Sequence, residues 1–479
     1  MFRGTMLHEA LSSVSWQIHL LPPELNVLAH CVVALSASIS VDYAIIGPGS
    51  KPASLSDRSV FSRGADLREY GIRRAPMYRA LCAEALRLAF EVGVAFEPSE
   101  HNAVSCFILQ FIENEKQARS RPFGMAYLSH VRAICESWVD IPDDTGLWAA
   151  YLLMEVMETT QRRQPVSVSH HDQLLITGGE PLSLQNLCVL SRGALQERKE
   201  REQLLMFAIM GPYVFHVTRV ARQLYEEITG DFARRHPLKE GSMAEVTSSL
   251  TQLHSIWSFI FEHDEPETHP GDAFFCLSPD QRDRHLNIRA CAFLMTFSRA
   301  TLVLALHREL VRRAAITISP PSSTGHGTGA ALADLWASER LTLLRRQVKD
   351  MADATLLEVA RALRSMPSLP HIAHSQRDAV IAWAEFCLDE ADATGSVLPV
   401  RAATMETISS ALKLVGYSWQ LPLGLVERLD AYVDTHRQLI PPFPEDSMFV
   451  DMFPEPLDND WMSMFTMPLG SELFAQSQS

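Results

Sequence analysis

Apolar residues recur at three- and four-residue steps along most of this chain, whereas the alternating patterns typical of strands are almost absent. The segment that opens at Pro76 is an example, because Tyr78, Leu81 and Ala85 fall on one face of a helix. The same periodicity predicts further helices over about residues 99–115, 123–138, 145–160, 183–228, 242–262, 279–315, 332–366, 375–393 and 405–415. We therefore expect an all-α fold, a large multi-helix domain.

Two breaks interrupt the helical pattern. Residues 319–329, SPPSSTGHGTG, have little to bury and predict a flexible loop. A Pro-rich turn at residues 440–444 marks the second break, after which the composition changes. The predicted units are N-terminal helices and a loop (1–65), a helical core (66–315), a flexible loop (316–331), C-terminal helices of the same domain (332–440) and a tail (441–479).

The tail has an unusual composition. Residues 441–479 hold seven acidic residues, six aromatics and five methionines, and no Lys, Arg or His. Like charges keep such a segment extended, so its aromatic side chains stay available to a partner. An ordinary disordered acidic terminus has a similar composition, and the alternative is an acidic activation segment whose partner-contacting anchors are Phe449, Phe453, Trp461 and Phe465.

Charge argues against direct contact with nucleic acid. The 479 residues have a formal net charge of −15, and no part of the chain forms a basic domain. Short basic clusters such as Arg162-Arg163, Arg234-Arg235 and Arg312-Arg313 mostly have acids within a turn or two, which is typical of solvated helix faces. We expect no nucleic-acid binding by this chain alone.

Cysteine spacing and hydropathy indicate an intracellular protein. The eight cysteines are scattered without a C-x-x-C pair, so they read as reduced thiols packed in helices. The stretch from Leu25 to Val41 has no formal charge but is short for a membrane span, and it predicts a buried helix after Pro22-Pro23. We expect no membrane association.

Motifs of catalysis and of metal or cofactor binding are missing. The chain has no G-x-S-x-G, Walker or H-E-x-x-H motif, and its glycines at residues 325–329 follow Pro and Ser where a strand should be. His170-His171-Asp172, residues 262–272, His371 and His374 read as solvated segments instead of metal ligands. We expect no catalytic, metal or cofactor site.

An all-α chain of this size also invites comparison with class I terpene cyclases. Asp143-Asp144 starts like their magnesium-binding D-D-x-x-D motif, but residue 147 is Leu. Asn459-Asp460 with Ser463 starts like the second motif, but Met467 stands where an acid is needed. A helical small-molecule-binding protein, or an enzyme acting on an apolar substrate, remains the alternative class.

A family resemblance extends over about residues 20–190 and, by helical character only, as far as 438. The run PMYRALCAEALRLAFEVGVAFEPSEHNAVSCFILQF, then FGMAYLSHVRAICESW and LWAAYLLMEVMETTQRRQPVSV, resembles the middle homology region of fungal binuclear-zinc-cluster transcription factors. The positions that align with its motifs are His130, Arg132, Trp148, Arg163 and Pro165. The family's Gly-Arg-Pro is Arg-Gln-Pro here, and its six-cysteine DNA-binding cluster is missing.

The resemblance implies a nuclear regulatory domain that masks or exposes an activation segment. Such a chain would reach promoters through a coactivator or a DNA-binding partner protein, or it is a piece of a longer protein that carries the cluster. A small-molecule effector and dimerisation are compatible with such a domain. By analogy with the family, the regulated genes belong to fungal metabolism or secondary metabolism.

Overall fold

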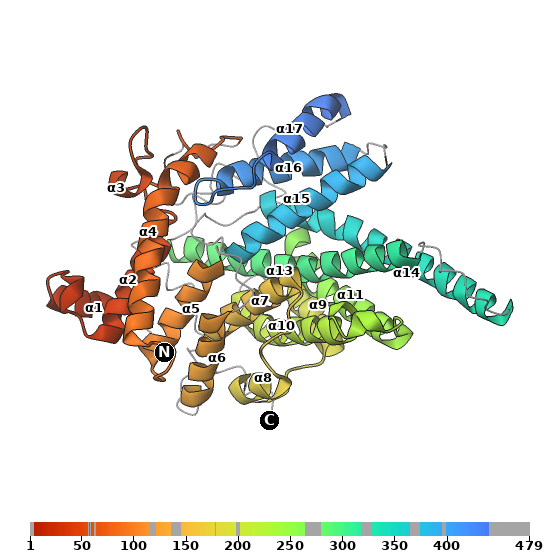
Figure 1. Ribbon diagram of the computed structural model, residues 1–479, viewed down its shortest axis with the longest axis horizontal. Helices are drawn as coiled ribbons and strands as arrows, with labels where there is room; N and C mark the ends of the chain where they lie inside the picture. Colours follow the sequence, from red (N-terminus) through yellow and green to blue (C-terminus); the bar gives the residue numbers. More distant parts are fainter. Residues whose placement is uncertain are drawn as a thin grey trace.

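A computed structural model describes most of the chain before residue 440 (Figure 1). The described residues are 4–55, 57, 59–61, 64–114, 121–135, 145–177, 179–197, 202–263, 279–317, 328–364, 374–394 and 399–439. Throughout these ranges the regular structure is helical and no strand occurs. The all-α fold that the periodicity predicts is therefore confirmed.

Most helices lie close to where the apolar periodicity places them. In chain order the longer ones are α1 (Gly4–Ser13), α2 (Pro23–Ala37), α4 (Arg68–Val92), α5 (Glu100–Asn114), α6 (Pro122–Ile134), α7 (Thr145–Arg162), α8 (His170–Thr177), α9 (Leu184–Glu197), α10 (Glu202–Leu224), α11 (Glu240–His263), α13 (Pro279–Thr317), α14 (Thr328–Arg364), α15 (His374–Thr394), α16 (Pro399–Val415) and α17 (Leu425–His436). Short turns α3 (Tyr43–Ile46), η1 (Ile18–Leu20), η5 (Tyr225–Thr229), η6 (Ala233–Arg235) and η8 (Arg437–Leu439) connect them.

Four expectations about elements were wrong. Helix α4 begins at Arg68 and contains Pro76 instead of opening there. Helix α8 occupies the segment from His170 that reads as a loop, because Ser169 at its start accepts a hydrogen bond from the Asp172 backbone N–H. Helix α17 was not predicted, although four of its apolar side chains are buried. The loop between α13 and α14 is also shorter at both ends than residues 316–331.

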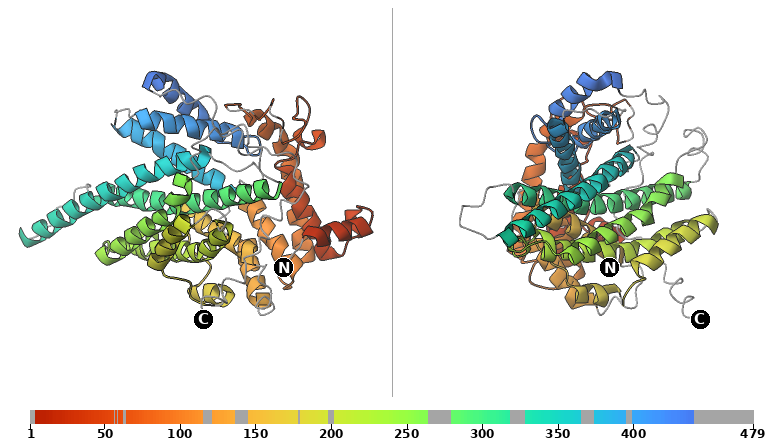
Figure 2. Two further views of the ribbon diagram at one scale, coloured as in Figure 1. Left: turned by 180° about the vertical axis from the view of Figure 1, so that it is seen from behind. Right: turned by 90° about the vertical axis from the view of Figure 1, so that its right-hand side faces the viewer.

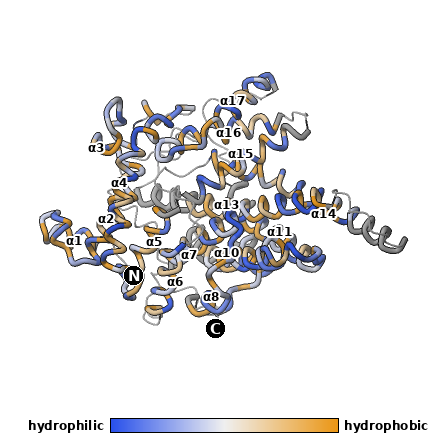
Figure 3. Tube along the Cα trace, in the orientation of Figure 1, coloured by the Kyte–Doolittle hydropathy of each residue, from blue (hydrophilic) through white to orange (hydrophobic). Residues whose placement is uncertain are grey.

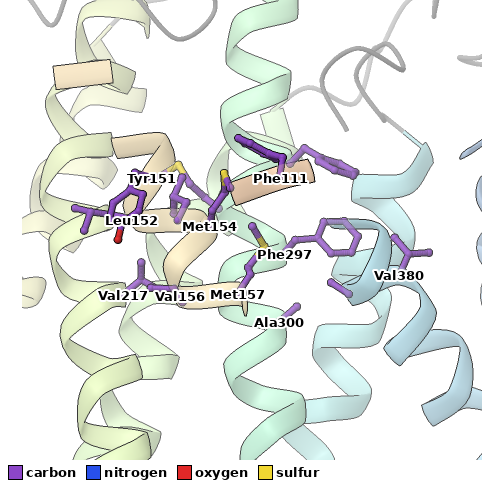
Figure 4. Close-up of a cluster of buried hydrophobic side chains, with 14 of the residues drawn as sticks. Phe111, Tyr151, Leu152, Met154, Val156, Met157, Val217, Phe297, Ala300 and Val380 are labelled. Atoms are coloured by element: carbon purple, nitrogen blue, oxygen red, sulfur yellow. The ribbon is translucent and has the colours of Figure 1, made fainter. Parts of the chain in front are cut away.

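Helix α7 lies at the centre of the fold. Every residue from 151 to 159 is buried, so the helix is enclosed on all sides instead of having one solvent face. Its Tyr151, Met154 and Met157 lie among side chains of α5, α10, α13 and α15, including Phe111, Val217, Phe297 and Val380 (Figure 4). Because α7 is held by contacts on all sides, the residues at both of its ends have defined positions.

The other helices form layers around α7. Helices α2, α4, α5 and α6 pack together on one side, and α9, α10 and α11 pack together on another (Figure 1). Helix α13 packs against both α7 and α14, while α15, α16 and α17 complete the C-terminal part (Figure 2). On many of the surrounding helices hydrophobic and hydrophilic residues are interspersed, as amphipathic packing against a core requires (Figure 3).

One described segment, Ala290–Ile316 of α13, is long and apolar enough to cross a membrane. Of its most apolar window, 89% is buried inside the fold, which is the pattern of a central core helix. The stretch near Leu25 forms the 15-residue helix α2 that begins at Pro23, as the sequence predicts. Seven cysteines are described, and these seven are buried and form no disulfide bond, which agrees with their scattered spacing.

Candidate functional site

Two buried carboxylates lie in the middle of α7. Glu155 accepts hydrogen bonds from the guanidinium of Arg121, just before α6, and from the backbone N–H of Ser167 at 2.7 Å. Glu158 accepts one from the side-chain amide of Gln110 on α5 at 3.1 Å. Burial raises the pKa of Glu158 to about 7, although Gln110 and nearby arginines act in the opposite direction. These contacts join three helices, and neither carboxylate faces solvent.

Of the family-motif positions, His130 lies on α6 and is buried. Burial lowers its pKa, so the ring is neutral at neutral pH, and Nε2 donates to the backbone oxygen of Val94 at 2.8 Å. That carbonyl belongs to the turn that follows α4. His130 therefore has a structural role, because its hydrogen bond joins α6 to a buried backbone carbonyl after α4, to which Cys106 Sγ of α5 also donates at 3.8 Å.

Arg132, two positions further along α6, forms a bidentate pair with Asp172 of α8. Its Nε and Nη2 each lie 2.7 Å from one carboxylate oxygen. Burial alone would raise the pKa of Asp172, but the hydrogen bonds from Arg132 and Ser169 outweigh it and lower the pKa to about 2. The segment His170-His171-Asp172 is thus part of a helix docked on α6 instead of a solvated loop.

Trp148 is buried near the start of α7, where its ring stacks on Tyr151 with centroids 5.5 Å apart. Arg163 directly follows the other end of the helix, and at 1.5 Å per residue the two Cα atoms are about 22 Å apart. The structure therefore does not bring the family-motif positions together at one site. They are distributed along α6 and α7 as parts of the framework.

The end of α7 has a well-defined geometry. Arg163 has a φ of 52°, in the left-handed region, and the backbone N–H of Gln164 donates to the carbonyl of Thr159 at 2.8 Å. With the bond from Arg163 N–H to Thr160 at 3.2 Å, this is a Schellman motif, and Pro165 prevents the helix from continuing. Residues in this position are usually glycine.

A pocket of about 310 Å³ opens beside this helix end. Its walls come from the end of α7, η5, η6, α13 and α15. Its lining residues are Thr160, Gln161, Arg163, Thr229, Arg234, Thr301, Leu304, Ala305, Arg308, Glu309, Arg312, Ala379, Ala382 and Trp383. With four arginines and one glutamate the lining has a formal charge of +3, opposite in sign to the whole chain. We call this feature the arginine pocket.

Glu309 organises the basic side of the arginine pocket. Its side chain is 1% exposed, and its two oxygens accept hydrogen bonds from Arg234, Arg312 and Arg313. Burial by itself would raise the pKa of Glu309, but these guanidinium groups lower it, so the carboxylate is ionised at neutral pH. One negative charge thus holds three positive ones in place. Arg308, one position before Glu309, forms a more exposed pair with Glu385 at 3.3 Å.

Sequence reasoning missed the arginine pocket. It interpreted Arg234-Arg235 and Arg312-Arg313 as solvated faces, which is wrong for Arg234 and for Arg313, whose side chains are 17% and 11% exposed. The spacing of Glu309 three and four residues before Arg312 and Arg313 was a signal of pairing, but Arg234 meets them only through the fold.

Several predicted residues lie outside the described ranges. These are the tail anchors Phe449, Phe453, Trp461 and Phe465, the near-miss pairs Asp143-Asp144 and Asn459-Asp460, and most of residues 262–272. In the part of the chain that is described, no three His, Cys, Asp or Glu side chains gather as a metal site.

Comparison with known proteins identified no relative of this chain. No family model matches this sequence, and no curated protein or solved structure is similar to it at a significant level.

Proposed function

We propose that this chain is the regulatory and activation portion of a fungal transcription regulator, acting in the nucleus through a coactivator or a DNA-binding partner protein. The observation that carries the proposal is the backbone at Arg163. In the alignment with the fungal middle homology region, this residue stands where the family has glycine. Its φ of 52° is the conformation that glycine adopts without strain, so the alignment and the geometry agree at the position where the sequence departs from the motif.

The helices that the resemblance covers also support the proposal. Helices α4 to α7 follow one another as the family pattern requires, with a Pro-Ser link before α5 and the Arg-Gln-Pro stop after α7. His130 and Trp148 are buried in this unit, as residues of a framework motif should be. The sequence has no zinc-cluster spacing and carries a net charge of −15, so we assign DNA recognition to a partner.

The activation role belongs to residues 441–479 in this proposal. Aromatic side chains bury a large apolar area on a partner, while neighbouring acids assist encounter and solubility. We therefore expect residues 438–479, fused to a heterologous DNA-binding domain, to drive a reporter gene. Replacing Phe449, Phe453, Trp461 and Phe465 by Ala should remove most of that activity, measured as reporter output at equal protein level.

The matched control keeps the aromatics and changes the charge. Replacing Asp451, Asp458 and Asp460 by Asn should reduce reporter output less than the aromatic variant does. If the quadruple Ala variant activates like the parent, or if the parent fusion is silent, the activation role is wrong.

A second candidate function is a helical small-molecule-binding protein, and the arginine pocket favours it. The sequence left this class open, and the ligand expected for it was an apolar substrate. The formal charge of +3 around the pocket instead favours an anionic ligand. A ligand-binding protein and a regulated transcription factor are compatible, because an effector site can lie inside a regulatory domain.

A further inference from the structure

We propose that the arginine pocket binds a small organic oxyanion, a molecule with a carboxylate or phosphate group and a compact hydrocarbon part. Guanidinium groups match the geometry of both oxyanions with paired hydrogen bonds. The pocket of about 310 Å³ lies at the lower end of the range for small-molecule sites, which are about 300–1,000 Å³. This ligand assignment depends on the pocket alone and stands without the transcriptional role.

The basic side is rigid before any ligand arrives. Arg234 and Arg312 are held by the buried carboxylate of Glu309. Arg313 binds the same carboxylate and also donates to the backbone oxygens of Ile228 at 3.0 Å and of Ala233, which precedes Arg234, at 3.1 Å. Because the arginines are already ordered, binding an anion costs less side-chain entropy than it would on a flexible surface.

Arg163 provides an independent observation. An L-residue in the left-handed region is strained, because its Cβ lies too close to a backbone carbonyl oxygen. A cation at the negative end of a helix recovers less free energy than this strain costs, so electrostatic interaction with α7 does not offset the strain. An exposed arginine is nevertheless present where glycine would fit better, and it lines the pocket. Backbone strain of this kind is typical of ligand sites.

Apolar side chains complete the lining and offer a surface for a compact hydrocarbon part. Leu304 and Ala305 lie one turn before Arg308 and Glu309 on α13, and Ala379, Ala382 and Trp383 come from α15. Trp383 is 0% exposed, and its indole nitrogen has no hydrogen-bond partner among the described residues.

Other occupants fit the pocket less well. A metal cation is disfavoured by the positive lining, which offers a single carboxylate already bound by three arginines. A nucleic-acid strand needs an extended basic groove along its backbone, and the net charge of −15 opposes its approach. A small oxyanion is therefore the class that the charge and the volume favour.

Calorimetric titration of the full chain tests the proposal. The probes are phenyl phosphate, benzoate, inorganic phosphate and the neutral benzyl alcohol. We expect phenyl phosphate or benzoate to bind more tightly than inorganic phosphate, benzyl alcohol not to bind, and affinity to fall as salt rises. Comparing phenyl phosphate with benzoate decides between phosphate and carboxylate as the head group.

Two variants localise the binding. Arg163→Gly removes the strained cation, and Arg308→Gln removes an exposed one on α13. Each should weaken binding of the aryl probe at least tenfold at low salt, while the melting temperature stays close to that of the parent. The matched control is Arg79→Gln, an exposed arginine on α4 away from the pocket, which should bind like the parent.

Two results would overturn the proposal. One is the absence of binding by both aryl oxyanions at millimolar concentration. The other is equal affinity in the parent and in a folded Arg163→Gly/Arg308→Gln double variant. If inorganic phosphate binds as tightly as phenyl phosphate, the hydrocarbon part of the assignment is wrong. The reporter assay of the tail needs neither ligand nor pocket, so the two proposals fail separately.

Discussion

At the scale of single residues, Glu155 and Glu158 are buried carboxylates on the same helix that have different hydrogen-bond partners. Glu155 is paired with Arg121, whereas Glu158 receives a neutral amide from Gln110. Burial disfavours the charged form of Glu158 more strongly than Gln110 and the nearby arginines favour it, so its pKa rises. The pKa of Glu158, about 7, is above the ordinary value of 4.5.

The raised pKa of Glu158 predicts a pH dependence of stability. Between about pH 4.5 and 7 the folded state binds more protons at this site than the unfolded state does, so the free energy of unfolding should fall as pH rises. Glu158→Gln removes this loss. The variant should gain roughly 2–3 kcal/mol over the parent at pH 8 and less than about 1 kcal/mol at pH 5, measured by urea unfolding.

The control for Glu158 is a carboxyl group with the opposite shift. Asp172 has a pKa of about 2, below its ordinary value, so its contribution is complete above about pH 4 and is lost only as pH falls toward 2. Asp172→Asn should therefore lower stability by the same amount at pH 5 and pH 8. A Glu158→Gln variant that keeps the parent's slope between these pH values would contradict the assignment.

At the scale of elements, the end of α7 illustrates a helix stop whose backbone and side chain favour different residues. The Schellman geometry favours glycine, but the residue present is Arg163. Helix α4, in contrast, continues past a proline, and tertiary contacts stabilise the turn before that proline. Arg74, which is fully buried, donates to the backbone oxygen of Ser40 at 2.7 Å and lies 4.2 Å from the ring centroid of Tyr417. These contacts hold the turn before Pro76 in place.

The helix stop gives a stability prediction for Arg163→Gly. Relief of left-handed strain of about 1–2 kcal/mol is offset by glycine's larger chain entropy and by the lost charge at the helix end, each worth up to about 1 kcal/mol. The free energy of unfolding should therefore be unchanged or raised by up to about 1 kcal/mol. Gln161→Gly, inside the same helix, should instead lose about 1 kcal/mol. A loss at Arg163 larger than that at Gln161 would show that the arginine has a structural role.

At the scale of the whole molecule, the N-terminal and C-terminal parts form one packed unit. The start of α4 meets the segment after α16, where Arg68 pairs with Glu427 of α17 at 2.6 Å. The N–H of Leu67 also donates to the backbone oxygen of Lys413 at 3.2 Å. A Cβ added at Gly71 would lie 2.1 Å from the backbone oxygen of Gly416, so the two segments approach more closely than any side chain allows.

The close approach at Gly71 gives a prediction. Gly71→Ala must push α4 away from the segment after α16, because the obstacle is backbone and cannot rotate aside. We expect a loss of roughly 2–4 kcal/mol in the free energy of unfolding, although alanine favours helix by about 1 kcal/mol. Gly211→Ala in α10, where an added Cβ meets nothing within 4 Å, is the matched control and should be neutral or stabilising. Equal stability of both variants would contradict this packing.

The sequence by itself determined the all-α class and most helix positions, because apolar spacing of three to four residues is a local property of the chain. It also placed the end of α7 close to residue 160, two positions before the observed last residue Arg162. It misplaced the start of α4, because Arg74 finds its partners in Ser40 and Tyr417, far away in the chain.

Only the tertiary structure decided the arginine pocket. Arg234 lies 75 positions before Glu309, and Trp383 comes from a third helix. No local pattern encodes such a meeting, since it depends on how helices pack around α7. For the same reason the burial of Glu158, and with it the raised pKa, could not be read from a sequence in which glutamate ordinarily marks a solvated face.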